Sequence, residues 1–200
     1  MINEAVILCG GLGTRLRSVV SDRPKCMAEV AGKPFLEHVV GHLRGQGISR
    51  VLFCIGYMGS DIYKHFGWIG EGMEFDYSIE ESLMGTGGGL RHAFPDIQSN
   101  TVLVLNGDTY CEFSLEVLEY WHLKWNAFTT RVMYEGLSAG VYLMQRRIIE
   151  MIPQGRPVSL EKEFLPSFFV HQVHTAMPFL DIGTPERYAA AEEFLVQHLH

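Results

Sequence analysis

A glycine-rich run directly after a short apolar segment is the first feature of this sequence that could do chemistry. It reads Gly10-Gly11-Leu12-Gly13-Thr14 and follows Leu8-Cys9. Glycines at such a place let the backbone approach a phosphate chain and point N–H groups at it. The run fits neither the P-loop nor the dinucleotide pattern G-x-G-x-x-G, because Leu16 stands where the third glycine belongs. An ordinary strand-to-helix turn is the alternative interpretation.

Basic residues follow within and shortly after this loop. Arg15 ends the glycine-rich run, and Lys25 lies in the segment Arg23-Pro24-Lys25, which is followed by Lys33-Pro34. Two lysines and two prolines in a short, rigid segment could focus positive charge on a polyphosphate. A solvated basic loop is the alternative, and the presence of Arg15 and Lys25 together favours a phosphate site.

Acidic residues occur at three turns further along the chain. Asn106-Gly107-Asp108 ends an apolar run, Asp181-Ile182-Gly183 precedes a predicted helix, and Glu80-Glu81 comes shortly before a glycine-rich turn. Without a function these segments would be a turn, a helix-capping aspartate and a surface acidic pair. Carboxylates at strand ends also suit Mg²⁺, which prefers one or two carboxylates together with phosphate oxygens and waters.

Alternating apolar and helical segments must position these residues. The runs 5–8, 51–55 and 102–105 predict buried strands, and the ranges 35–46 and 114–125 have helical periodicity. Continuously apolar strands that alternate with helices indicate a mainly parallel sheet covered on both faces. Ligands of such sheets bind beyond the carboxyl ends of the strands. We therefore expect one domain over residues 1–200, which ends in a helix over Pro185–Leu199 with Tyr188, Ala191, Phe194 and Leu195 facing inward.

The composition excludes several classes of partner. The net charge of −7 argues against nucleic acid and against an anionic membrane, because both require a basic surface. No apolar run approaches the ~20 residues of a membrane span. The four cysteines show no C-x-x-C spacing and are expected to be buried free thiols. These features and the absence of a signal peptide predict a cytoplasmic protein.

The order of these motifs resembles the sugar-1-phosphate nucleotidyltransferases over nearly the whole chain. The motifs are G-G-x-G-T-R-L, then P-K, G-K-P-x-[LI], L-M-G-T-G-G, N-G-D and D-I-G-T-P. This resemblance implies a three-layer αβα, Rossmann-like fold with a mainly parallel sheet, GTP and a sugar 1-phosphate as partners, and Mg²⁺ as cofactor. The oligomeric state stays open, with a homodimer as one option.

The resemblance also implies a role for individual residues. Arg15 and Lys25 would be catalytic, and Asp108 and Asp181 would bind the metal. The implied nucleotide-binding residues are Leu8, Gly10, Gly11, Gly13, Thr14, Arg15, Lys25, Glu80, Gly85 and Thr86. In the family the residue at Glu80 contacts the pairing edge of the base, and Glu81 is the alternative reader.

The sugar side shows one departure from the family. The implied substrate-binding residues are Asn106, Gly107, Ser138, Gly140 and Glu161, with Ser138 where asparagine is usual. A plain strand and a capped helix start are the alternatives for the last three. Between Thr130 and Gly136 the family carries an extra strand pair and a Glu-Lys dipeptide that binds the sugar phosphate. Either this protein shortens that insert, or the sequence lacks residues that the intact enzyme has. The second explanation is favoured, because an intact enzyme should need the cation that binds the sugar phosphate.

The expected reaction is one in-line displacement. The sugar phosphate attacks the α-phosphorus of the nucleotide, pyrophosphate leaves, and catalysis is positioning and charge neutralisation. GTP is favoured because guanine offers two adjacent donors to Glu80. Within the family the motifs are most similar to members that use D-glycero-α-D-manno-heptose 1-phosphate for capsule or surface polysaccharide, with mannose 1-phosphate as the alternative. A non-catalytic sugar-nucleotide sensor and a nicotinamide oxidoreductase are rivals from other classes.

Overall fold

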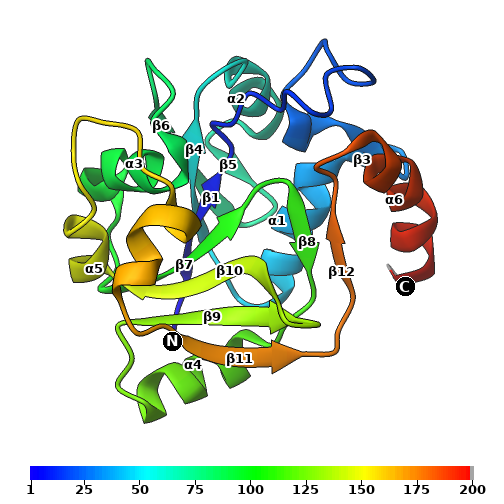
Figure 1. Ribbon diagram of the computed structural model, residues 1–200. Helices are drawn as coiled ribbons and strands as arrows, with labels where there is room; N and C mark the ends of the chain where they lie inside the picture. The colour runs from blue at the N-terminus through cyan, green and yellow to red at the C-terminus, as the bar shows by residue number, and fades with distance from the viewer. Residues whose placement is uncertain (199–200) are drawn as a thin grey trace.

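A mixed eight-stranded sheet forms the centre of the computed structural model, which describes residues 1–198 (Figure 1). Its strand order is β11-β9-β10-β7-β1-β4-β6-β5. The central strands β7, β1, β4 and β6 are parallel neighbours, whereas β10 runs antiparallel to both β7 and β9, and β5 runs antiparallel to β6. The strands are β1 Glu4–Leu8, β4 Arg50–Ile55, β5 Ile69–Gly70, β6 Met73–Ile79, β7 Thr101–Asn106, β9 Thr129–Tyr134, β10 Leu137–Gln145 and β11 His171–Thr175.

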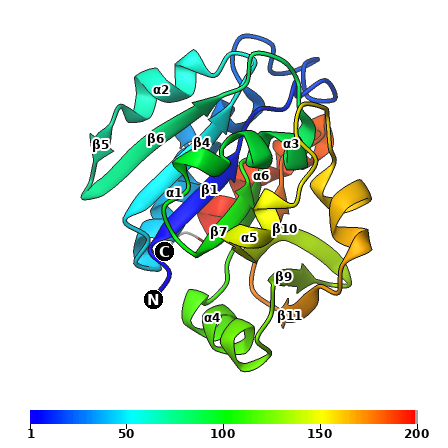
Figure 2. The ribbon, with the colours of Figure 1, turned by 90° about the vertical axis from the view of Figure 1, so that its left-hand side faces the viewer.

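The predicted apolar strands are buried on both faces of the sheet. Along β1, Ala5 and Ile7 pack into one hydrophobic cluster, whereas Val6 packs into another on the opposite face. This alternation follows from the two-residue period of a strand. The first cluster includes residues of α1 (Phe35–Gly45), α2 (Ser60–Phe66), α4 (Leu115–Lys124) and α6 (Pro185–His198). The second includes residues of α3 (Gly85–His92) and α5 (Arg146–Glu150), which confirms the three-layer αβα architecture (Figure 2).

The predicted helices are found with small changes at their ends. Ser114 caps α4, because its hydroxyl accepts a hydrogen bond from Val117 N at 3.3 Å. In α6, Ala191 and Leu195 are fully buried and Tyr188 and Phe194 pack partly buried against the core, as expected; Leu199 lies outside the described residues. None of the helices within residues 1–198 is both long enough and apolar enough to cross a membrane.

Two small sheets lie beside the carboxyl ends of the central strands. β8 (Thr109–Cys111) pairs antiparallel with β12 (Phe179–Asp181), and β2 (Glu29–Val30) pairs with β3 (Lys33–Pro34). The β8–β12 pair places Asp181 opposite Thr109. A segment near the end of the chain is thereby brought to the end of the central strand β7.

A tight turn joins β9 to β10 where the family insert was expected. Tyr134 pairs with Leu137, and the two residues between them, Glu135 and Gly136, have φ angles of 47° and 81°. Positive φ at both central residues is typical of a type I′ turn, whose twist matches that of a hairpin. The described chain therefore closes this hairpin without an extra strand pair.

Candidate active site

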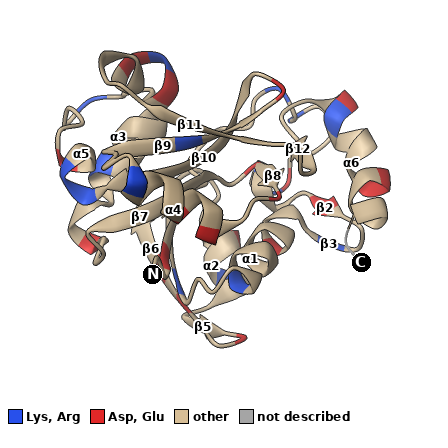
Figure 3. Cartoon of the chain, turned by 90° about the horizontal axis from the view of Figure 1, so that it is seen from below, with Lys and Arg blue, Asp and Glu red and all other residues tan. Residues whose placement is uncertain are grey.

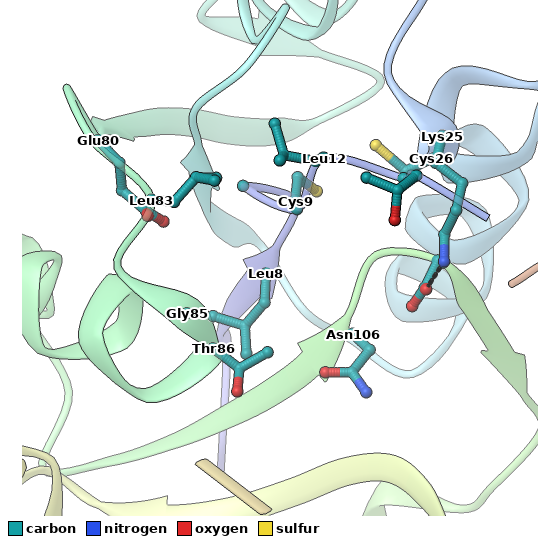
Figure 4. A pocket seen from close by; sticks show the side chains of 15 residues that line it. Leu8, Cys9, Leu12, Lys25, Cys26, Glu80, Leu83, Gly85, Thr86 and Asn106 are labelled. Atoms are coloured by element: carbon teal, nitrogen blue, oxygen red, sulfur yellow. Dashed lines mark ion pairs between the residues drawn. The ribbon is translucent and has the colours of Figure 1, made fainter. Parts of the chain in front are cut away.

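A cavity of about 460 Å³ opens at the carboxyl ends of β1 and β7. Figure 4 shows its side chains, with Glu80 and Leu83 on one side and Lys25 and Cys26 on the other. It brings together segments from four separate parts of the sequence. Its lining residues are Leu8, Cys9, Gly10, Gly11, Leu12, Gly13, Thr14, Lys25, Cys26, Glu80, Leu83, Gly85, Thr86, Asn106 and Asp108.

The glycine-rich run forms one wall of this cavity. After β1 the chain continues in turns, anchored by the buried side chain of Leu16, and the next helical residues are Lys25–Met27. The alternative of a simple strand-to-helix turn is therefore wrong. Gly107 approaches the start of this run so closely that a Cβ atom on it would lie 2.6 Å from Cys9 Sγ. A side chain at residue 107 would collide with the wall.

Lys25 and Asp108 form an ion pair inside the cavity. The Lys25 ammonium contacts Asp108 Oδ2, and the two side chains are 15% and 31% exposed. Lys25 begins a short helical turn whose next residues, Cys26 and Met27, are buried and hold it against the core. Asp108 follows the end of β7. The pair places one positive and one negative charge in the wall of the cavity.

Asp181 lies next to Asp108, although the two are far apart in the sequence. Ile182 N donates a hydrogen bond to Asp108 O at 3.1 Å, next to the β8–β12 pairing. The Asp181 carboxylate accepts from Gly183 N at 2.5 Å and forms an ion pair with Arg187. Thr184 Oγ1 accepts from Arg187 N at 3.4 Å, so the residue that caps α6 is Thr184, not Asp181.

These two aspartates fit the donor set that Mg²⁺ requires. Within residues 1–198, no group of three or more His, Cys, Asp or Glu side chains gathers into a protein-only metal cage. Mg²⁺ does not need such a cage, because it uses one or two carboxylates and takes its remaining ligands from phosphates and waters. Asp108 and Asp181, on adjacent backbone segments and each partly accessible, have this chemistry.

Glu80 projects into a space that two glycines leave open. A Cβ atom on Gly10 or Gly89 would lie 2.6 or 2.3 Å from Glu80 Oε1, so a side chain at either residue would displace this carboxylate. Glu80 Oε2 accepts from Met84 N at 3.1 Å. Burial raises the pKa of the Glu80 carboxyl, and the Met84 hydrogen bond opposes that rise. The neighbouring Glu81 is exposed and is not among the residues that line the cavity.

The predicted sugar-side residues form a cluster beside the cavity. Ser138 and Tyr142 on β10 both contact Glu161, which lies in the short helical turn Leu160–Phe164. Gly140 abuts Asn106, since a Cβ atom on it would lie 2.6 Å from Asn106 Nδ2. Ser159 caps the helical turn by accepting from Lys162 N at 3.2 Å, which confirms the capped helix start without excluding a role for Glu161.

Not all predicted residues line the cavity itself. Arg15 is exposed and lies beside the Asp181–Gly183 turn, where its Nη2 would be 3.4 Å from a Cβ atom on Gly183. The structure places the other predicted residues next to the cavity but outside its wall: Gly107, Ser138, Gly140, Glu161 and Asp181.

Sequence reasoning missed several residues of the site. Cys9 and Cys26 are buried free thiols, as expected, but they also line the cavity. The hydrogen bond that the Cys9 thiol donates to Cys26, together with burial, raises the pKa of Cys9, which keeps that thiol protonated. Leu83 lines the cavity next to Glu80, and Tyr142 contacts Glu161. For Tyr142, its place in the sequence two residues after Gly140 was the one sign that it could lie near the sugar-side residues.

Taken together, a glycine loop, a lysine and two carboxylates at the carboxyl edge of the sheet define a nucleotidyltransferase site. Comparison with known proteins agrees: residues 5–154 match the model of the MobA-like NTP transferase domain, and the chain belongs to this family of nucleotidyltransferases. A D-glycero-alpha-D-manno-heptose 1-phosphate guanylyltransferase from Aneurinibacillus thermoaerophilus is 34% identical over 230 aligned positions, which cover 98% of this chain and 100% of that protein.

Two further proteins are similar over nearly the whole chain. Mannose-1-phosphate guanylyltransferase from Mycobacterium tuberculosis is 30% identical over 97% of this chain and 65% of that protein. The crystal structure of HddC from Yersinia pseudotuberculosis superposes with a TM-score of 0.85 at 30% identity, covering 96% of this chain and 99% of HddC, and a structure of HddC complexed with GMP-PN gives 0.84. The 230-position alignment is longer than this 200-residue chain, so the Aneurinibacillus protein has residues without a counterpart here.

Proposed function

We propose that this protein transfers the guanylyl group of GTP to D-glycero-α-D-manno-heptose 1-phosphate and releases pyrophosphate. The observation that carries the proposal is that the glycine loop, Lys25, Glu80 and Asp108 line one cavity of about 460 Å³. Such a cavity has the size of a small-molecule site. It combines donors for a phosphate chain at one side with a carboxylate acceptor for a base at the other.

Glu80 is the proposed reader of the base. An ionised carboxylate accepts from two donors at once, and guanine offers N1–H and the N2 amino group side by side. Uracil and thymine offer one donor between two acceptors. Glu80 lines the cavity and Glu81 is exposed, which supports Glu80 as the residue that selects GTP. By analogy with base-edge readout, this contact would discriminate by about 1–3 kcal/mol.

Lys25 and Arg15 are the proposed catalytic cations. A phosphate monoester dianion is already a nucleophile, so the sugar 1-phosphate needs no general base to attack the α-phosphorus. Lys25 borders the cavity and Arg15 lies beside Asp181, so the two cations flank the region where the phosphates would lie. Their charge would stabilise the phosphate oxygens and the departing pyrophosphate. Mg²⁺ held by Asp108 and Asp181 would supply further positive charge to the same oxygens.

The sugar is proposed from the relatives. The Aneurinibacillus protein, whose name gives heptose 1-phosphate as substrate, matches this chain along its entire length, whereas the mycobacterial protein named for mannose 1-phosphate is matched over 65% of its length. The two sugars share the manno ring and differ by one exocyclic carbon with its hydroxyl. A pocket that hydrogen-bonds this hydroxyl can reject mannose strongly, whereas one that only has room for it cannot.

A pyrophosphate-release assay tests the proposal. The protein would be incubated with Mg²⁺, with GTP, UTP or dTTP, and with heptose 1-phosphate or mannose 1-phosphate in competition. We expect the highest kcat/KM for GTP with heptose 1-phosphate. A higher efficiency with mannose 1-phosphate would refute the sugar alone, and equal use of UTP would refute the base reader. Tight nucleotide binding without pyrophosphate release would favour the non-catalytic sensor.

The proposal extends to the setting of the reaction. A GTP-dependent enzyme with four free buried cysteines suits the reducing, nucleotide-rich cytoplasm, and the product would serve capsule or surface polysaccharide synthesis. Acidic and basic residues are interspersed over residues 1–198 (Figure 3), so the positive charge of the site comes from individual side chains.

A homodimer is also proposed, since α4 exposes the apolar side chains of Val117, Tyr120 and Leu123. Light scattering across a concentration series would test this oligomeric state.

A further inference from the structure

Tyr142 carries a buried hydroxyl that the apolar packing of the core does not require. Its side chain is fully buried in β10, among apolar residues such as Val104 and Met144. The hydroxyl donates to Glu161 Oε1 and lies 3.0 Å from Ser138 Oγ. Burial, and then the nearby Glu161 carboxylate, raise the pKa of Tyr142, so the phenol stays a donor throughout the physiological range.

The hydroxyls of Tyr142 and Ser138 converge on the same carboxylate oxygen. Ser138 Oγ lies 3.1 Å from Glu161 Oε1, and it also accepts from Gly140 N at 3.4 Å. Tyrosine and serine each have one hydroxyl proton to donate. Both protons are thus used within this cluster, and Glu161 Oε1 is its final acceptor. Within residues 1–198, Glu161 Oε2 has no hydrogen-bond partner, and the Glu161 side chain is exposed.

The backbone directly before Glu161 is held by the first turn of α3. Leu160 N donates to Thr86 Oγ1 at 2.9 Å, and Gly87 N donates to Val158 O at 2.9 Å. Thr86 itself lines the nucleotide cavity. Glu161 is therefore held twice, through its neighbour Leu160, whose backbone bonds to Thr86 in α3, and through its side chain, which contacts β10. A glutamate that is held near its backbone and at one carboxylate oxygen presents its other oxygen in one direction.

From this geometry we infer that Tyr142 and Ser138 are positioning residues, which hold Glu161 so that Oε2 accepts a hydroxyl of the sugar 1-phosphate. The inference rests on the proposed function and adds to it the two hydroxyls that orient the Glu161 carboxylate. Neither hydroxyl touches the substrate. Their effect is to leave one acceptor, instead of a freely rotating carboxylate, facing the sugar, which reduces the entropy lost on binding.

Kinetics with hydroxyl-deleted variants test this inference. The variants are Tyr142→Phe, Ser138→Ala and Glu161→Gln, and Tyr77→Phe is the matched control, because the Tyr77 hydroxyl donates to Gly67 O on the other half of the sheet. We expect Tyr142→Phe to raise KM for the sugar 1-phosphate about 10-fold, as loss of a hydrogen bond to a charged group would. KM for GTP and kcat should stay within about twofold. Ser138→Ala should act in the same direction, and Tyr77→Phe should change neither KM.

A deoxy-sugar series supplies a readout that a merely structural role would not move. Wild-type enzyme should lose efficiency with the 1-phosphate that lacks the hydroxyl bound by Oε2, and Tyr142→Phe should lose little more with that same analogue. An unchanged sugar KM in both Tyr142→Phe and Ser138→Ala, or equal rises in both KM values, would overturn the inference. If Tyr142→Phe does not fold, Ser138→Ala decides alone. Wild-type protein that releases no pyrophosphate with any sugar 1-phosphate would instead refute the proposed function.

Discussion

Removing the Lys25 charge is the most direct test of how this site works. Lys25→Met keeps the length of the side chain and deletes its positive charge. The Lys25 side chain is 15% exposed and lies in the cavity wall, so little water separates its ammonium from a phosphate bound there. A unit charge about 4 Å away contributes about 4 kcal/mol at an effective dielectric constant of 20. Removal of one preorganised donor typically costs about 100- to 1,000-fold in kcat.

We therefore expect Lys25→Met to lower kcat at least ~100-fold at saturating GTP and sugar 1-phosphate. Lys25→Ala should do the same, since the charge and not the chain length is responsible. The assay is pyrophosphate release with both substrates varied. Lys33→Ala is the matched control, because Lys33 is 60% exposed and pairs with Glu37 at 3.3 Å, outside the cavity; it should keep wild-type kcat.

Stability separates a catalytic loss from unfolding. The ion pair of Lys25 with Asp108 is partly exposed, so its loss should change the melting temperature by no more than about 4 °C. Wild-type kcat in Lys25→Met would show that this cation does not act on the transition state. A large fall in melting temperature together with lost activity would show a structural role instead.

The remaining predictions concern Asp108, Glu80 and Arg50. Asp108→Asn should abolish Mg²⁺-dependent pyrophosphate release while leaving the melting temperature nearly unchanged; activity that persists across a Mg²⁺ titration would contradict this. Burial raises the pKa of Glu80, so lowering the pH through that raised pKa should reduce the preference for GTP over UTP, as Glu80→Gln should at every pH. Because the folded protein favours the neutral form of Glu80, this carboxyl contributes to the free energy of unfolding below its unfolded-state pKa, near 4.5. That contribution is lost as the pH rises through the raised pKa of the folded state. Glu80→Gln, which stays neutral, should therefore melt at a higher temperature than wild type at neutral pH. Arg50→Met removes the charged partner of the buried Glu4 carboxylate, which keeps only its hydrogen bonds from Gln98 N and Ser99 N. This change should cost about 3 kcal/mol of unfolding free energy, or at least ~6 °C in calorimetry; an unchanged melting temperature would refute that estimate.

The local elements of this protein follow from neighbouring residues. The apolar runs within β1, β4 and β7 predict strands buried on both faces, because every side chain in them must leave water whichever face it points to. The cap of α4 at Ser114 is likewise a contact between residues three apart. Such features depend on short stretches of chain, so the sequence predicts them well.

The residue types of the site are also legible in the sequence. The glycines before Thr14, the lysine at 25, and the carboxylates after β7 and at the end of β12 each indicate phosphate or metal chemistry by their type and their place near the end of a strand. The resemblance of their order to a known family predicted the nucleotidyltransferase class, which the family match confirms. Where the sequence left alternatives, the residues were too few to exclude a turn, a cap or a surface pair.

Only the tertiary structure decided which of these residues meet. Asp181 reaches Asp108 because β12 pairs with β8, and a strand register cannot be deduced from either strand alone. Gly10 and Gly89, from different parts of the chain, leave space for the Glu80 carboxylate at the cavity, whereas Glu81 is exposed. The Tyr142–Glu161 contact and the hydrogen bond from Leu160 to Thr86, 74 residues away, depend on how the segment around Glu161 packs against β10 and α3. These contacts form between distant segments, and the packing of the whole core, not the local sequence, sets their geometry.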